Sequence, residues 1–364
     1  MTLMRRYSKN GRYATIFFQL LFPAHLLAQQ VSVSQDMVIN RGLLDDKFWK
    51  DYPLHAQTER VIAYTDVGAA FSWKVFDQSF IYERKTINTL ITNTNTLALS
   101  AREGAYSSQM NNGQIALQAQ TKRYKYDSWG WHWTNASAHE SFNWTITPKW
   151  IRLFDFREGD GLATLAKDDN TLSLHGDLSR SGTSSYGYDS NPAKVNFLNG
   201  GAIDISMQWE SQSLKAVTQV QNFYSKIPVQ SAYFSNRNYN INATTAQGIT
   251  YSEVPSLRGT YGQQDMQLSL PKILKAEVAY KNVMANLWLK SGVVGIDGRN
   301  LPWIGAMYNL YDHQFEVKNY QMNNTQFLYR TPPFFKERLS GEIVITRDSS
   351  GSTKSLLGGV NLKF

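Results

Sequence analysis

The sequence contains no cysteine in its 364 residues, and it contains only six histidines. The absence of cysteine excludes disulfide bonds and every metal site that requires a thiolate ligand. The chain also lacks a His-Glu-x-x-His motif and a glycine-rich phosphate loop, so the usual signatures of zinc hydrolases and nucleotide-binding proteins are missing. We therefore expect neither a metal ion nor a cofactor.

Charged residues are scarce as well. They make up 18% of the chain, against roughly a quarter of an average soluble protein. No apolar run after the N-terminal segment reaches the length of about 18 residues that a membrane-spanning helix needs. Aromatic residues, in contrast, reach 13%, and the mean hydropathy is −0.40. This combination is typical of a transmembrane β-barrel, because half of each strand faces water and the loops are polar.

The C-terminal residues alternate between an apolar and a mostly polar face. The apolar face carries Leu356, Gly358, Val360, Leu362 and Phe364. A period of two residues indicates a strand, and a strand with one apolar and one polar side suits a closed barrel in lipid. At Gly359, Leu362 and Phe364 the tail resembles the C-terminal assembly signal of Gram-negative outer-membrane β-barrel proteins, although Leu357 stands where that signal usually has a polar residue. The resemblance implies an outer-membrane location and recognition by the outer-membrane barrel assembly machinery.

The N-terminus has the outline of a secretory signal peptide. An apolar run from Ala14 to Leu27 follows four basic residues, and Ala28 is a suitable cleavage residue. We therefore expect residues 1–28 to be removed and the mature chain to begin near Gln29. Removal lowers the net charge from +8 to +4, since 33 basic residues then remain against 29 acidic ones. This mild excess permits contact with outer-membrane lipids and the phosphates of lipopolysaccharide, and it does not indicate nucleic-acid binding.

The mature sequence divides into two regions. Residues 29–60 show no strand alternation, and we expect them to lie in the periplasm or to form a small plug in the lumen. Residues 61–364 alternate between strand patterns and turn signals such as Asp297-Gly298. The predicted fold is all-β, an antiparallel transmembrane β-barrel of about 16 strands within a range of about 12–18, because closure with both termini in the periplasm requires an even number.

Alternation within the predicted strands assigns their faces. Apolar residues share one parity in 115–119, 276–280, 283–289 and 304–310, and we expect them to face lipid. The lumen-facing candidates are polar residues of the opposite parity: Lys275, Glu277, Lys281, Asn286, Lys290, Glu342 and Lys363. The lysines among them favour the passage of anions, because inward cations raise the local anion concentration.

Loop lengths predict the orientation of the barrel. The stretches 179–199 and 224–247 are rich in Ser, Asn, Tyr and Gly, and we expect both to be external loops because periplasmic turns are short. Counting back from a periplasmic C-terminus places residues 159–170 on the periplasmic side.

Two clusters have several interpretations. Trp129, Trp131 and Trp133 share a strand face, which suits an interfacial aromatic girdle, cross-strand packing or an aromatic track in the lumen. The basic residues 122–125 are expected at a strand end, on a solvated rim that faces lipopolysaccharide.

One pair of residues could carry hydrolytic chemistry. His139 and Ser141 are two residues apart, so in a strand both side chains would share a face. A histidine beside a serine can take the hydroxyl proton during acyl hydrolysis. The spacing resembles that of the phospholipase and lipid A deacylase barrels of the outer membrane, but Phe142-Asn143 replaces the Asn-Gly that follows the serine in the phospholipases. No convincing third catalytic residue is evident.

Three functions therefore fit the sequence. The sequence favours a porin-like channel for small hydrophilic solutes, with anions and saccharides as candidates, because barrels of about sixteen strands leave an aqueous passage. The second function is a non-conducting surface or envelope barrel, such as an adhesin, a polysaccharide-associated barrel or an assembly factor. The third is an outer-membrane lipid hydrolase. The lining of the lumen distinguishes the first two functions. Opposed rows of charged residues indicate a channel, whereas a lumen closed by packed side chains indicates a non-conducting barrel.

Overall fold

A computed structural model of the chain provides the structure. The described residues are 28–39, 53–54, 60–75, 78–101, 112–135, 141–169, 171–183, 196–197, 199–244, 256–282, 286–320, 324–332, 339–348 and 353–363. The predicted signal peptide, residues 1–28, therefore lies outside them except for Ala28. None of the helices in this part of the chain is long and apolar enough to cross a membrane.

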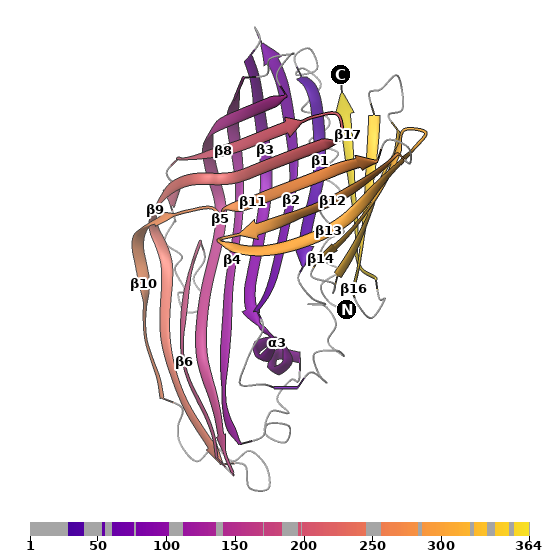
Figure 1. Ribbon diagram of the computed structural model, residues 1–364. Coiled ribbons are helices and arrows are strands. Elements are labelled where there is room, and N and C mark those ends of the chain that lie inside the picture. Colours follow the sequence, from indigo (N-terminus) through magenta and orange to yellow (C-terminus); the bar gives the residue numbers. More distant parts are fainter. Residues whose placement is uncertain are drawn as a thin grey trace.

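Antiparallel strands form a ring (Figure 1). In ring order the fourteen strands are β1 (Ala28–Ile39), β2 (Arg60–Val75), β3 (Gln78–Asn93), β4 (Gly113–Thr134), β5 (Phe142–Asp168), β8 (Gly200–Glu210), β9 (Leu214–Thr244), β11 (Ile273–Asn282), β12 (Leu287–Ile296), β13 (Arg299–Leu310), β14 (His313–Tyr320), β15 (Asn324–Arg330), β16 (Leu339–Asp348) and β17 (Thr353–Lys363). Because β1 pairs with both β2 and β17, the ladder of pairings returns to its first strand. The all-β antiparallel prediction is confirmed, and the fourteen ring strands of the described residues lie within the predicted range.

Strand β1 corrects the prediction that residues 29–60 contain no strand. It pairs with β2 from Ala28 to Ile39, and Gln30 pairs with Lys363 of β17. Val31, Val33, Met37 and Ile39 share one parity, so the two-residue period is present in the sequence. The pattern is easily missed because the polar Gln35 stands among the apolar odd-numbered positions, and the apolar Val38 stands among the polar even-numbered positions.

Three of the ring strands continue beyond the ring, where they pair with additional strands of the same sheet. β4, β5 and β9 are 22, 27 and 31 residues long. Beyond the ring, β5 and β9 enclose β6 (Thr171–Gly182), and β9 also pairs with β10 (Ser256–Leu268) and the short β7 (Asn196–Phe197). We call the part of the sheet made by β6, β10 and the outer parts of β4, β5 and β9 the extension. The β17 arrow points toward one end of the ring, and the extension lies at the other end (Figure 1).

The extension changes three loop assignments. Residues 224–244 of the predicted external loop 224–247 belong to β9, and residues 159–168 of the predicted periplasmic stretch belong to β5. The predicted loop 179–199 also begins inside β6, which ends at Gly182. Polar residues occupy both faces of these strands, so the apolar alternation of a half-buried strand is missing from them. The hairpin between β5 and β6 lies at the end of the ring opposite the start of β1 and the end of β17, whereas the count placed it at the same end as the C-terminus.

The ring strands β11, β12 and β13 have the face assignment that the sequence predicts. Val278, Leu289 and Ile304 are exposed on the outer face, whereas Ile273, Ile296 and Leu301 of the opposite parity are buried. The hairpin between β12 and β13 turns at Asp297-Gly298, with φ of 49° and 79°. Positive φ at both positions is typical of the two-residue turns whose twist matches that of paired strands, which explains the Asp-Gly sequence there.

A short helix next to β4 overturns one face assignment. Asn93 caps α3 (Thr94–Ala101), because its Oδ1 accepts hydrogen bonds from the Thr96 backbone N (2.9 Å) and Oγ1 (2.8 Å), as at an N-cap. Leu99 of this helix packs against Ile115 and Leu165, and all three are buried. Ile115, which we expected to face lipid, is therefore covered by α3.

Candidate functional site

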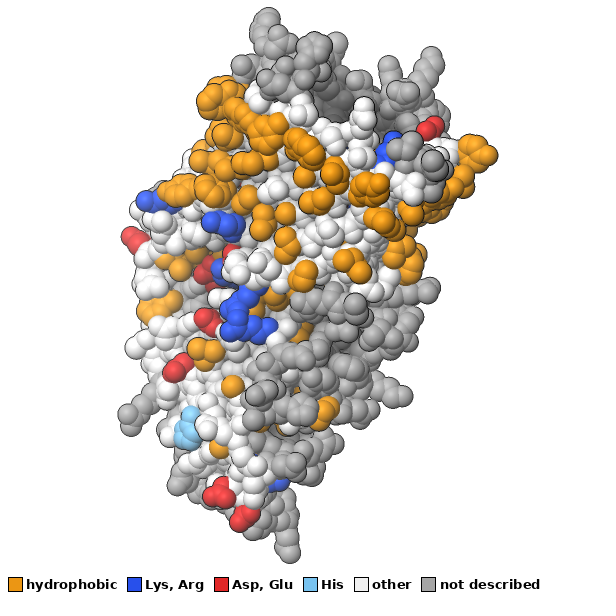
Figure 2. All heavy atoms as spheres, viewed as in Figure 1, with side chains coloured by type: hydrophobic (Ala, Val, Ile, Leu, Met, Phe, Trp, Pro, Cys, Tyr) orange, Lys and Arg blue, Asp and Glu red, His pale blue; other side chains and the backbone are white. Residues whose placement is uncertain are grey.

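The outer surface of the ring carries a band of large exposed apolar side chains (Figure 2). Eleven residues on β9 and β11–β16 have exposed fractions of 37–59%, and we call them the apolar belt: Leu214, Val278, Tyr280, Leu289, Ile304, Tyr308, Leu310, Phe315, Val317, Phe327 and Ile343. The pairing register places residues of the belt next to one another on adjacent strands, since Tyr280 pairs with Leu214 on one side and with Leu289 on the other. A soluble monomer rarely exposes a contiguous apolar surface of this extent.

Aromatic residues continue this surface on the wall formed by β2–β5. The rings of Phe71, Tyr82, Trp129 and Trp150 follow one another across the four strands, with centroid distances of 6.1, 5.2 and 4.6 Å. Trp131 is exposed on the same face, whereas Tyr126 on the opposite face is buried. The predicted tryptophan cluster therefore lies outside the ring, and the interpretation as an aromatic track in the lumen is wrong.

The inner face of β11–β14 carries ion pairs. The Nζ atom of Lys290 lies 3.0 Å from Oε1 of Glu277 and 3.0 Å from Oε1 of Glu316. The side chains of Lys290 and Glu316 are 10% and 3% exposed. Lys318 adds a second cation, 3.5 Å from the same Glu316 oxygen. The structure thus brings Glu277 and Lys290 of the lumen-facing candidates together, on the face opposite the apolar belt.

The other candidates are dispersed. Lys281 lies over the ring of Trp288 at 5.5 Å, and Glu342 accepts a hydrogen bond from Arg330 Nε at 2.6 Å. Lys275 is half-buried on the same face as Glu277. Asn286 is exposed in the turn before β12, with φ of 49°. The prediction of a strand position there is therefore wrong.

The assembly signal stays a prediction. Gly359, Leu362 and Lys363 belong to β17, which pairs with β16 and β1. Phe364 lies outside the described residues.

A buried cluster of charges on β2, β3, β5 and β8 was not found from the sequence. Lys149 Nζ contacts Glu83 Oε2 and lies 2.5 Å from Asp204 Oδ2. Lys85 Nζ lies 3.0 Å from Glu83 Oε1 and 3.8 Å from Asp66 Oδ2. The alternating Glu83 and Lys85 are a usable signal for an inner polar face, but only the register shows that β5 and β8 supply the partners.

The interior of the ring is packed where the ring meets the extension. One cluster of buried side chains joins residues of β2–β5 to residues of β11–β14, including Tyr64, Tyr124, Ile273, Ile296 and Trp303. The same cluster includes Ala202 of β8, Ile227 of β9 and Leu268 of β10, so it follows neighbouring strands around the inner face of the ring.

Two polar contacts join β4 to segments that are not its neighbours in the ring. Lys122 Nζ lies 2.7 Å from Asp297 Oδ2, and the Tyr124 hydroxyl lies 3.3 Å from the carbonyl oxygen of Ser269, which precedes β11. The same hydroxyl donates to Glu158 of the neighbouring β5. We call the buried cluster together with these contacts the seal. The basic residues 122–125 therefore lie inside β4 and not at a strand end, and Lys122 is engaged within the molecule.

Of the proposed hydrolytic pair, Ser141 belongs to the described residues and His139 does not. Ser141 is exposed and precedes β5, and its carbonyl oxygen accepts a hydrogen bond from the Glu210 backbone N at 2.8 Å. His139 lies outside the described residues. Since β4 ends at Thr134 and β5 begins at Phe142, Ser141 is not a strand residue, and the argument that both side chains share a strand face does not apply.

Among the described residues no group of three or more His, Asp or Glu side chains is placed to hold a metal ion. The titratable side chains of the ring interior are instead paired with one another, as in the Lys149 and Lys290 clusters. Such fixed ion pairs can order the strands and fill the interior with polar groups. In the Lys149 cluster the Ser128 hydroxyl also donates a hydrogen bond to Glu83 Oε2 at 3.0 Å.

The fold and surface described above define an antiparallel β-ring with an apolar outer belt. No known protein family profile matches the chain, and no curated protein matches it. A solved structure that it resembles is the alcaligin outer membrane receptor FauA from Bordetella pertussis, at 9% sequence identity and a TM-score of 0.19. That alignment covers 92% of this chain and 76% of the receptor.

Proposed function

We propose that the chain is an outer-membrane β-barrel and that the apolar belt is its lipid-facing surface. The belt supports this proposal because its side chains are large, exposed and adjacent on seven neighbouring strands. A ring of paired strands satisfies its backbone hydrogen-bond groups internally, which is the condition for crossing a bilayer without helices. Charged side chains of the same strands point the other way and are paired, as Lys290 is.

The proposed orientation places the extension outside the cell. Both the start of β1 and the end of β17 lie at one end of the ring, since Gln30 pairs with Lys363. The long β5–β6 hairpin lies at the other end, and outer-membrane barrels carry their longer connections on the external side. The assembly machinery would then meet the C-terminal strand from the periplasm, and lipopolysaccharide would surround the rim near the extension.

The seal favours a non-conducting surface barrel over an open porin. An open passage needs a water-filled route between the walls, whereas here Tyr124, Ile296 and Leu301 are almost completely buried in one cluster. Lys122 and Asp297 add an ion pair between the same walls. The seal is the single observation on which this choice of function class depends.

Conductance across a planar bilayer tests the proposal. We expect the purified, folded protein to insert and to show no steady ion conductance in KCl, because the seal leaves no aqueous path. The variant Lys122→Ala/Asp297→Ala removes the ion pair without touching the apolar cluster, so it should remain closed. Steady conductance of the unmodified protein would contradict the closed-barrel proposal and would leave the membrane location intact.

A porin-like channel is the second candidate, and the polar inner face near Lys290 supports it. Lys290, Lys318, Glu277 and Glu316 line the interior of β11–β14, as an aqueous lumen requires. If the protein conducts, the reversal potential in a KCl gradient distinguishes anion from cation preference. No observation on the described residues supports the lipid-hydrolase alternative.

A further inference from the structure

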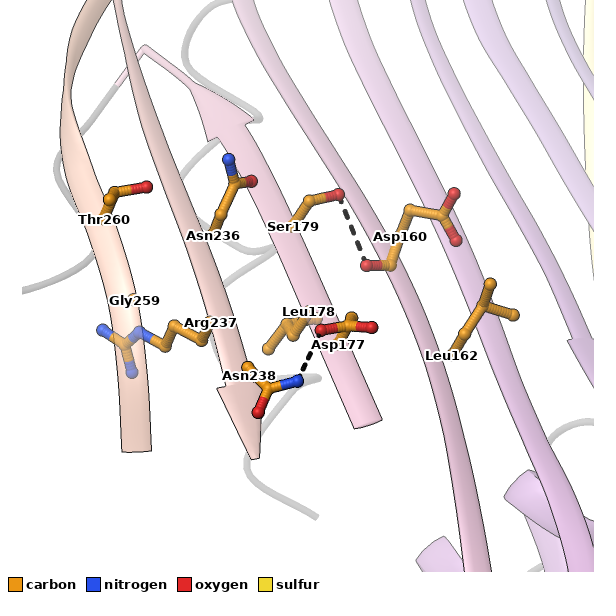
Figure 3. A pocket seen from close by; sticks show the side chains of 10 residues that line it. All are labelled: Asp160, Leu162, Asp177, Leu178, Ser179, Asn236, Arg237, Asn238, Gly259 and Thr260. Atoms are coloured by element: carbon orange, nitrogen blue, oxygen red, sulfur yellow. Dashed lines mark hydrogen bonds between the residues drawn. The ribbon is translucent and has the colours of Figure 1, made fainter. Parts of the chain in front are cut away.

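The inner face of the extension contains a hollow that the proposed barrel function does not use. It has a volume of about 480 Å³ and lies across β5, β6, β9 and β10 (Figure 3). The register continues the inner face of the ring onto this sheet, because Lys122 pairs with Glu158 and Gln120 pairs with Asp160. The hollow is therefore on the polar side of the sheet, next to the seal.

Four polar side chains cross the hollow in register. Asp160 pairs with Ser179, Ser179 with Asn236, and Asn236 with Thr260, so one side chain from each strand stands in a row. All four are exposed, and Figure 3 shows them in line. Neighbouring strands place such groups about 4.8 Å apart. The row is a regular array of hydrogen-bonding groups.

Several groups of this array are available to a ligand. Within the described part of the chain, neither the Asp160 carboxylate nor the Asn236 amide has a hydrogen-bond partner, and Ser179 Oγ makes only a 3.5 Å contact to the Asp160 carbonyl oxygen. In the next row Asn238 Nδ2 donates to Asp177 Oδ1 at 2.9 Å, beside the exposed Leu162. Donors, acceptors and an apolar patch thus lie side by side.

A second hollow extends the first toward the seal. It has a volume of about 320 Å³ and shares Asp160, Ser179 and Asn236 with the first. Three acidic residues that line the hollows, Glu158, Asp160 and Asp177, share the parity of the row, whereas Arg180 and Arg237 have the opposite parity and Lys122 is paired with Asp297. The carboxylates therefore disfavour a polyanion, and they can accept hydrogen bonds from the hydroxyl groups of an uncharged ligand.

We propose that this surface binds a neutral oligosaccharide. Sugar hydroxyls both donate and accept hydrogen bonds, which matches the mixed carboxylate, amide and hydroxyl groups of the row. The C–H faces of sugar rings are apolar and match Leu162 and Phe234, which line the hollows. An elongated chain of sugar units suits two hollows that share three residues, and ligand pockets typically combine apolar walls with a few convergent polar groups.

The test is a binding measurement on the full-length protein in detergent. The probes are the neutral hexasaccharides of the malto-, cello-, manno- and isomalto- series, with an oligogalacturonate as the anionic and a chitosan hexamer as the cationic comparison. We expect at least one neutral probe to bind, and we expect Asp160→Ala/Asn236→Ala to weaken that binding about tenfold or more, since each lost hydrogen bond lowers affinity. Asp160→Asn should retain most of it, because the amide keeps an acceptor.

The control variant is Gln263→Ala on the opposite face of β10, whose register partner is Tyr233 and not a residue of the row. It should bind as the unmodified protein does, and unchanged tryptophan fluorescence verifies that each variant is folded. The proposal is overturned if only a charged probe binds, if no probe binds, or if the double variant binds normally. Binding in detergent needs no bilayer, so these outcomes are separable from a failure of the membrane proposal.

Discussion

Leu289→Arg should strongly impair assembly of the protein in a bilayer. Leu289 lies on the outer face of β12 within the apolar belt, with an exposed fraction of 52%. Placing an arginine on the lipid face of a barrel costs about 2–4 kcal/mol at the bilayer midplane. The measurement is the free energy of unfolding in lipid vesicles, together with the yield of the heat-modifiable folded form.

The matched control is Leu162→Arg in the extension. Leu162 is exposed to almost the same degree, 55%, and also lies on a strand. Because we place it in water, the substitution should change the free energy of unfolding by no more than about 0.5 kcal/mol, as at an ordinary surface position. Equal effects of the two substitutions would show that the belt is not in lipid.

Lys149→Met should destabilise the protein by about 3–5 kcal/mol, because removing one partner of a buried ion pair leaves an uncompensated charge. Lys149 contacts both Glu83 and Asp204, and the Lys149 and Glu83 side chains are 6% and 8% exposed. Methionine fills a similar volume, so the loss reports the charge and not a cavity. Chemical unfolding followed by tryptophan fluorescence measures it.

The exposed pair Arg330–Glu342 is the control for this effect. Its side chains are 46% and 34% exposed, and exposed pairs contribute about 0–1 kcal/mol. Arg330→Met should therefore cost far less than Lys149→Met. If both substitutions cost the same small amount, the cluster around Lys149 is open to water and the interior is not packed as described.

The sequence is informative wherever the two faces of a strand meet different surroundings. Val278, Leu289 and Ile304 show their outward direction through a two-residue period, because their neighbours face charged partners such as Lys290. The same reasoning fails for residues 224–244, since both faces of that part of β9 carry polar residues. Without a hydrophobic difference between the faces, such a strand looks like a polar loop.

Local patterns also miss contacts made by distant segments. Ile115 has the alternation of a lipid-facing residue, but Leu99 of α3 covers it. A register shift in the pairing of β4 with β5, where Lys125 pairs with Asp155 but Tyr126 with Leu153, reverses the parity of inward residues along β5, from Leu153 to Phe156. The sequence predicts the Asp297-Gly298 turn, but only the fold shows that Asp297 meets Lys122 across the interior.

Some residues of the candidate sites could be placed from the sequence, and others only from the fold. Glu277 and Lys290 could be placed on an inner face from parity alone, whereas the row from Asp160 to Thr260 could not be predicted. Its four residues come from four strands and span a hundred positions of the chain, so no spacing rule connects them. Their proximity follows from the pairing of β5, β6, β9 and β10.

Site-directed spin labelling in lipid vesicles tests most directly whether the apolar belt lies in a membrane. The chain contains no cysteine, so a single introduced cysteine carries the only label. At Leu289→Cys and Ile304→Cys the label should be more accessible to molecular oxygen, which concentrates in the hydrocarbon, than to a water-soluble nickel chelate. At Leu162→Cys and Asn238→Cys in the extension we expect the reverse. Equal and high accessibility to nickel at all four positions would contradict the membrane-embedded barrel.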